Sequence, residues 1–231
     1  MMLDAEESRH MLTVLRMSAG DRLILINGSG CEMTAEILRE EAGCAVLEVL
    51  SAAVSDAEPA NNVVLFQGLP KAGKLDLIIQ KCVELGISAI RPVSMKRCVV
   101  KPEKNDGKLA RFNRISHEAA KQCLRSTVPE VYAPVKLAEC DFSAFDLVLV
   151  AFEGEEKLTL KLALEKAKPD LKHNADIALV IGPEGGFDES EVEYLLASNK
   201  NAFSVSLGKR ILRTETAGLA MLSMLMYELE G

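Results

Sequence analysis

A glycine-rich corner between a strand and a helix is the first feature of this sequence with chemical meaning. The stretch ALVIGPEGGFDESEVEYL, residues 178–195, runs from an apolar strand into Gly-Pro-Glu-Gly-Gly and then into a helical pattern. Glycines at such a corner let a ligand approach the backbone closely. A tight turn explains Asp188, which is placed to cap the helix in a capping box with Glu191. It does not explain residues 182–186 as a unit, so we expect ligand contact there.

The corner is poorly suited to a phosphate. Pro183 has no N–H to offer, and Glu184 adds negative charge where a pyrophosphate would lie. The chain also lacks both the Gly-x-x-x-x-Gly-Lys-Ser/Thr loop and the Gly-x-Gly-x-x-Gly fingerprint. A neutral or zwitterionic ligand fits better, which disfavours a nucleotide-binding oxidoreductase.

A second loop, SLGKRILRTETAG, carries Lys209, Arg210 and Arg213 just before the last helical pattern. We expect Thr214 or Thr216 to cap this helix. The helix itself, AGLAMLSMLMYEL, is apolar almost all round. This pattern predicts a helix buried on all sides, as core or as a subunit contact.

The elements that must position these loops fall into two groups. A short helix at 4–15 is followed by the strand-like stretches DRLILING, CEMTAEIL and CAVLEVL, which predict a small antiparallel β unit. Residues 51–62 have the composition of a linker. After the linker, apolar strands alternate with amphipathic helices, which predicts an α/β fold with a parallel sheet and helices on both faces. Ligands bind such sheets outside the carboxyl ends of the strands, where both loops lie.

Composition narrows the class of protein. The chain has 231 residues, of which 48% are hydrophobic, so it can bury a core. No apolar run approaches the roughly 20 residues of a membrane span, and no basic signal-peptide start is present, so we expect a cytoplasmic protein with no membrane contact. The six cysteines form no Cys-x-x-Cys pair and the chain has three histidines. We expect reduced, mostly buried thiols and no metal site.

One segment has a net charge opposite in sign to that of the whole chain. The net charge is −7, yet nine Lys or Arg stand against three acidic residues between Lys96 and Arg125. A solvated helix face and a polyanion-binding surface both account for this asymmetry.

The motifs also resemble a known family. IGPEGG followed by LGKRILRTETA resembles the ribosomal RNA small subunit methyltransferase E family of the SPOUT superfamily. GKLDLIIQKCVELGISAIRPVSMKRCVVK and EAAKQCLRSTVPEV are similar to that family's other signature stretches, and RHMLTVLRMSAGDRLILING resembles its PUA-like RNA-binding barrel. The resemblance covers essentially the whole chain.

The resemblance implies S-adenosylmethionine-dependent methylation of N3 of a uridine in 16S ribosomal RNA, and a homodimer. It implies a PUA-like β-barrel at 1–58 and a SPOUT methyltransferase domain at 63–231 with a C-terminal trefoil knot, a rare topology. The family starts with a short strand that this chain lacks, so we expect a barrel without its first strand. The alternatives are methylation of another atom, such as a ribose 2′-hydroxyl, and an RNA-binding protein without catalysis.

The resemblance further implies which residues form the site. The cofactor-binding residues expected in the loops at 151–153, 181–186 and 207–216 are Phe152, Glu153, Ile181, Gly182, Pro183, Gly185, Gly186, Leu207, Gly208, Ile211, Leu212 and Thr216. The uracil N3–H is a weakly acidic imide, so its methylation requires proton removal and stabilisation of charge on the ring carbonyls. Arg213 and Arg97 suit the second task, and Glu215 is the candidate proton acceptor or orienting group. The candidate RNA-binding residues are Arg16, Arg97, Arg111, Arg114, Gln122 and Arg125.

Overall fold

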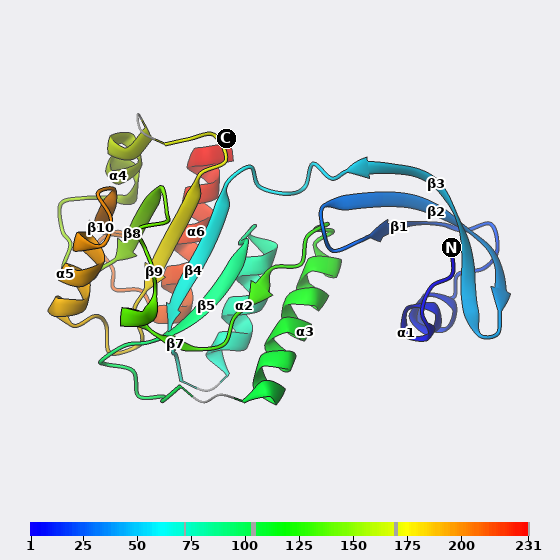
Figure 1. Cartoon of the computed structure of the whole chain (residues 1–231), viewed down its shortest axis with the longest axis horizontal. Coiled ribbons are helices and arrows are strands. Elements are labelled where there is room, and N and C mark those ends of the chain that lie inside the picture. The colour runs from blue at the N-terminus through cyan, green and yellow to red at the C-terminus, as the bar shows by residue number, and fades with distance from the viewer. Residues whose placement is uncertain (72, 103–104, 169–170, 231) are drawn as a thin grey trace. The chain divides into compact units, whose positions relative to one another are not determined.

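The computed structural model describes residues 1–71, 73–102, 105–168 and 171–230, and Figure 1 shows its elements along the chain. The chain divides into two compact units. The first comprises residues 1–58 together with 124–127, and the second comprises 59–123 and 128–231. The sequence did not predict that the short segment 124–127 belongs to the first unit.

The first unit is built on a three-stranded antiparallel sheet in the order β1-β2-β3. Its elements are α1 (Ala5–Arg9), a π-helical segment (His10–Val14), β1 (Arg22–Ile26), β2 (Cys31–Glu41) and β3 (Cys44–Val54). Alternate residues of the strands point into a small core that includes Ile37 and Leu47. The first residues of the chain lie beside β3, since the terminal amine of Met1 donates to the carbonyl of Leu47. Extended pairing therefore precedes α1, which the sequence did not predict.

The second unit contains a parallel sheet, as predicted. The described strands form a seven-stranded sheet in the order β10-β8-β9-β4-β5-β6, with β7 also paired to β5. They are β4 (Asn62–Gly68), β5 (Ala89–Ser94), β6 (Glu130–Val131), β7 (Val135–Lys136), β8 (Leu147–Ala151), β9 (Asp176–Ile181) and β10 (Ala202–Val205). The sequence predicted a linker over 51–62, but β3 continues to Val54, so the irregular connection is shorter.

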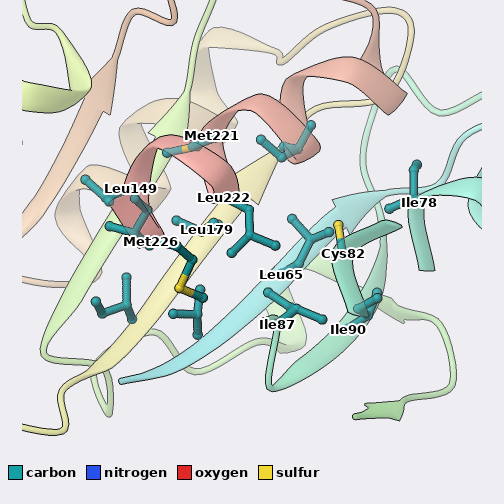
Figure 2. Close-up of a cluster of buried hydrophobic side chains, with 14 of the residues drawn as sticks. Leu65, Ile78, Cys82, Ile87, Ile90, Leu149, Leu179, Met221, Leu222 and Met226 are labelled. Carbon is teal, nitrogen blue, oxygen red and sulfur yellow. The ribbon is translucent and has the colours of Figure 1, made fainter. Parts of the chain in front are cut away.

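Helices cover both faces of this sheet. They are α2 (Lys74–Glu84), α3 (Asp106–Gln122), a 3-10 turn (Leu137–Glu139), α4 (Leu160–Ala167), α5 (Glu189–Ala197) and α6 (Thr214–Glu230). Side chains such as Leu65 and Leu179 pack against α2, α4 and α6, and Figure 2 shows this cluster. Neighbouring residues of the same strands, such as Phe66 and Val180, pack against α5 on the opposite face. The alternation follows from the two-residue period of a strand.

Two expectations about burial need correction. Helix α6 buries Met221, Leu222 and Leu225, but Tyr227 is 79% exposed, so α6 is not buried on all sides within one chain. Of the six free cysteines, only Cys82 and Cys140 are buried. Burial raises the pKa of the Cys82 thiol to about 12, which makes it inert.

A buried hydrogen-bond network joins the start of α6 to the ends of two strands. Gln67 at the end of β4 donates through Nε2 to the Thr214 hydroxyl at 2.8 Å and to the carbonyl of Gly68 at 3.0 Å. The Thr214 hydroxyl donates in turn to the carbonyl of Gly182, beyond β9, at 2.6 Å. The sequence predicted a helix cap for Thr214 or Thr216; the Thr214 hydroxyl instead makes these long-range bonds.

We predict that Thr214→Val lowers the free energy of unfolding by about 1–3 kcal/mol. Valine keeps the shape but leaves the carbonyl of Gly182 and one N–H of Gln67 buried without this partner, and unsatisfied buried groups cost about that much each. Chemical denaturation measures the change. The control is Thr216→Val, an exposed position in the same turn, where the change should stay within about 0.5 kcal/mol. Equal effects at both positions would contradict the role assigned to the network.

Candidate functional site

A cavity of about 1010 Å³ lies at the carboxyl ends of β8, β9 and β10. The three loops singled out from the sequence form most of its wall. Of the expected cofactor-binding residues, the following line it: Phe152, Glu153, Ile181, Gly182, Pro183, Gly185, Gly186, Leu207, Gly208, Ile211 and Leu212. Thr216 is not among the described lining residues. The walls include the side chains of Lys74 and Arg213, of which Lys74 was not anticipated.

Close packing of the protein against itself explains the glycines of the 182–186 loop. A Cβ on Gly185 would lie 3.0 Å from both the Cβ and the carbonyl oxygen of Arg97. A Cβ on Gly186 would overlap the carboxylate of Glu153, and the φ of Gly186 is +68°. The sequence predicted that these glycines allow the close approach of a ligand. The structure shows that neighbouring loops of the same chain require them.

The 207–212 loop, by contrast, leaves its backbone free. Within the described chain, one hydrogen bond involves this stretch, from the N–H of Gly208 to the hydroxyl of Ser206 at 3.4 Å. Gly208 has a φ of +113°, and nothing lies within 4 Å of where its Cβ would be. Backbone N–H and C=O groups that the fold does not satisfy are available to a ligand. This loop can therefore recognise a flat polar ring through main-chain hydrogen bonds.

Apolar side chains supply the other half of the cavity wall. The rings of Phe152 and Phe187 meet edge to face, with centroids 6.4 Å apart and an interplanar angle of 79°. Ile181 is buried at the end of β9, whereas Ile211 is 88% exposed. Apolar walls combined with a few fixed polar groups are typical of small-molecule sites.

Comparison with known proteins assigns both units. Residues 57–226 match the model of an RNA methyltransferase domain, and residues 3–49 match that of an RNA methyltransferase PUA domain. The chain is 35% identical to ribosomal RNA small subunit methyltransferase E of Bacillus subtilis, over 99% of this chain and 90% of the relative. The chain belongs to the ribosomal RNA small subunit methyltransferase E family.

Solved structures support the assignment to this family. The crystal structure of a ribosomal RNA small subunit methyltransferase E from Neisseria gonorrhoeae, bound to S-adenosyl methionine, is 32% identical and has a TM-score of 0.82. A methyltransferase from Legionella pneumophila in complex with the bound cofactor SAM gives the same two values. Each alignment covers 99% of this chain and 91% of the other chain.

The two candidate arginines of this family member differ in their surroundings. Arg213 lines the cavity and is exposed, and its guanidinium makes no hydrogen bond or ion pair with any residue that the structure describes. Arg97 lies beside the cavity, where its guanidinium donates to the carbonyl of Gly185 at 3.4 Å. Both residues are exposed, and of the two only Arg213 has a guanidinium without a hydrogen-bond partner among the described residues.

An ion pair and hydrogen bonds made by Lys96 hold the loop that contains Arg97 against the start of α5. The ammonium of Lys96 lies 2.9 Å from Asp188 and donates to the hydroxyl of Ser190 at 2.6 Å. The N–H of Lys96 donates to Glu191 at 2.7 Å, and Glu191 forms the predicted capping box with Asp188. Donation from the Ser190 hydroxyl, followed by Lys96, lowers the pKa of Asp188 to about 2. The helix cap expected from the sequence therefore also positions Arg97.

Glu215 is held in an ion pair. The Lys74 ammonium lies 2.8 Å from Glu215 and 3.0 Å from Glu184. The hydrogen bond from Lys74 lowers the pKa of Glu215. A carboxylate whose pKa is lowered is a poorer proton acceptor, so this geometry favours an orienting role for Glu215 over that of a base.

The candidate RNA-binding residues are in different situations. Helix α3 presents Arg114 and Gln122 on its exposed side, and it also presents Arg111, which forms an ion pair with Asp76 of α2 at 2.6 Å. Arg16 is exposed in the first unit. Lys104 of the basic segment lies outside the described residues.

Arg125 requires a correction. Its side chain is 5% exposed, and it forms an ion pair with Glu58 at 2.7 Å inside the first unit. Glu58 also accepts from the N–H of Thr127 at 2.9 Å. A buried, paired arginine ties segment 124–127 to its own unit, so the geometry argues against the RNA contact expected of it.

No pattern in the sequence indicated the roles of Lys74 and Gln67. Gln67 lies at the end of β4 and Lys74 is the first residue of α2, and each has a partner more than a hundred residues further along the chain. In the described part of the chain, no helix could span a membrane and no three potential metal ligands are grouped together.

We predict that the stabilising effect of Asp188 is lost in acid. Because its pKa is lower in the folded protein than the ordinary value of 3.8, its contribution to stability is complete above that value and is lost as the pH falls through about 2. The difference in unfolding free energy between the wild type and Asp188→Asn should therefore shrink as denaturation is measured at decreasing pH. Lys96→Met should move this loss to higher pH. If the difference in unfolding free energy stays constant across this pH range, Asp188 does not stabilise the fold through its ion pair with Lys96.

Proposed function

We propose that this protein uses S-adenosylmethionine to methylate N3 of a uridine in 16S ribosomal RNA of the small subunit. One observation supports this most directly. The cavity of this family member combines apolar walls with a loop whose backbone N–H and C=O groups are mostly not hydrogen-bonded within the described chain. An adenine ring needs that combination, whereas a phosphate needs a cluster of N–H donors and positive charge.

The residues of the cavity fit the cofactor. The 207–212 loop would hold the adenine edge with its main chain, and Ile181, Leu207 and Leu212 would contact its faces. Glu153 is exposed at the cavity wall, where it complements a positive charge. S-adenosylmethionine, when bound, supplies an electrophilic methyl group on a positively charged sulfur. The remaining chemistry belongs to the residues of this chain.

The residues around the cavity would activate the uracil ring. When N3 loses its proton, negative charge spreads onto the ring carbonyls, and a fixed guanidinium stabilises it. Arg213 is assigned this role because its guanidinium has no partner in the described part of the chain, and Arg97 contacts the base or a neighbouring phosphate. Glu215 orients the start of α6 beside Arg213. The target base must leave its stack to enter the cavity.

The finer architecture proposed for the chain follows the family. The second unit forms a SPOUT-type trefoil knot at its C-terminus, and the first unit forms a PUA-like barrel that binds RNA. The protein acts in the cytoplasm as a homodimer. The exposed side of α6, with Met224 and Tyr227, supports the dimer because such apolar side chains are suited to an isologous contact. A monomer mass in light scattering at micromolar concentration would contradict it.

Nucleoside mass spectrometry of 16S rRNA treated with the protein and S-adenosylmethionine tests the function. We expect a new 3-methyluridine. A ribose-methylated nucleoside would move the reaction to another atom. Cofactor binding without any methylated nucleoside, on both naked rRNA and small subunits, would contradict the enzymatic role.

We predict that Arg213→Ala separates catalysis from binding. If Arg213 acts chiefly in the transition state, its loss lowers the rate and leaves ground-state binding nearly intact. Single-turnover methylation should fall at least about a hundredfold, while the affinities for S-adenosylmethionine and rRNA stay within about threefold. Arg213→Lys, which keeps the charge, should retain more of the rate. If cofactor affinity falls as far as the rate, the role of Arg213 is to shape the cavity, and Arg97 becomes the candidate for stabilising the transition state.

We predict that Arg114 contributes to the salt dependence of rRNA binding more than Arg111 does. Arg111 is already paired with Asp76, so its charge is less available to a phosphate. Arg114→Ala should weaken binding and reduce the slope of log affinity against log salt by about one, because one phosphate contact is lost. Binding titrations at several salt concentrations measure this. An unchanged slope in Arg114→Ala would make this side of α3 a solvated face.

A further inference from the structure

Lys74 joins two loops of the candidate site through its ammonium group. It is the first residue of α2 and lines the cavity. Its Nζ lies 3.0 Å from Glu184 in the β9–α5 loop and 2.8 Å from Glu215 in the first turn of α6. Glu184 also accepts from the N–H of Lys71 at 3.0 Å. Three segments of the chain, following β4, β9 and β10, therefore meet at this cluster.

The cluster is adjacent to the groups that contact the ligands. Glu184 lies between Pro183 and Gly185, both in the cavity wall, and Glu215 follows Arg213 by two residues. A shift of either carboxylate would move the cofactor loop or the catalytic candidate. Errors of about 1 Å in the placement of such groups are enough to impair a site.

The charges at this point depend on Lys74. The side chains of Lys74, Glu184 and Glu215 are 27%, 23% and 16% exposed. Lys74 is the only ion-pair partner of either carboxylate within the described chain. Burial by itself would raise the pKa of Glu184, but the bonds from Lys71 N–H and Lys74 lower it overall. Without Lys74, two partly buried carboxylates would repel each other, and the attraction of Arg213 for Glu215 would offset this only in part, which is costly.

We propose that Lys74 is a positioning residue of the methyl-transfer site, because its ammonium group holds Glu184 and Glu215, and with them the β9–α5 and β10–α6 loops, in the arrangement that binds the cofactor. The inference rests on the proposed function and adds a residue to it. Lys74 acts through the two carboxylates and takes no part in the transfer. Its loss therefore raises the cofactor concentration that half-saturates the enzyme and largely spares turnover at saturation.

Calorimetry with S-adenosylhomocysteine, the demethylated product, tests this on the full-length protein. Lys74→Met should weaken binding about tenfold or more, since both loops are released. Lys74→Arg, which keeps a cation in reach of both carboxylates, should stay within about threefold of wild type. With rRNA and saturating cofactor, the bound cofactor itself holds both loops in place, so Lys74→Met should keep its turnover within about threefold of wild type. A fall in turnover as large as the fall in affinity would overturn the positioning role.

The matched control is Lys172→Met. Lys172 is a lysine paired with a mostly buried carboxylate, Asp146 at 2.6 Å, but Asp146 precedes β8 and so lies at the amino edge of the sheet. Its loss should leave product binding unchanged. Equal weakening in Lys172→Met and Lys74→Met would mean that the effect is a general loss of stability, and would overturn the inference.

A triple variant separates positioning from direct contact. In Lys74→Met/Glu184→Gln/Glu215→Gln the repulsion between the carboxylates is gone, so binding should recover part of what Lys74→Met loses. If the triple variant binds no better than Lys74→Met, the ammonium contacts the ligand itself and the proposal is wrong. Wild-type binding of the product is the reference. Its absence would remove the proposed function, whereas intact binding in both the wild type and Lys74→Met would remove only this inference.

Discussion

The hydrogen bonds between Gln67, Thr214 and the carbonyl of Gly182 are the constraint on which the site depends. They connect the end of β4, the end of β9 and the start of α6 inside the protein. A buried polar group without a partner is costly, so few arrangements of these three segments are stable. The loop before Thr214 supplies one wall of the cavity, and the loop after Ile181 supplies another. The network therefore determines the distance between the two walls.

Internal ion pairs neutralise much of the charge around the cavity. Lys74 pairs with Glu184 and Glu215, and Lys96 pairs with Asp188. Arg213 has no such partner in the described chain. Lys209 and Arg210, which line the same cavity, have no such partner there either, so the lining cations without an ion pair in the described chain all lie in the loop that precedes α6.

The glycine-rich corner has a different meaning in the structure from the one the sequence suggested. Gly185 and Gly186 are small because Arg97 and Glu153 pack against them. The loop whose backbone groups are left unpaired is instead the one at 207–212, where a single glycine, Gly208, has a positive φ and open space beside it. The loop at 182–186 still forms part of the cavity wall, but its glycines are required because other loops of the protein pack closely against them.

The sequence by itself determined the features that depend on neighbouring residues. Apolar runs and amphipathic periods specified the parallel sheet, Asp188 and Glu191 specified their helix cap, and the strand ends located the three loops of the cavity. Only the tertiary structure decided which side chains form ion pairs and hydrogen bonds with each other. Arg125 and Arg114 look alike in one basic segment, yet one is buried against Glu58 and the other is exposed. Lys74 and Gln67 act through residues more than a hundred positions away. Local patterns follow from the geometry of one strand or helix, whereas these pairings exist only once strands distant in the chain lie side by side.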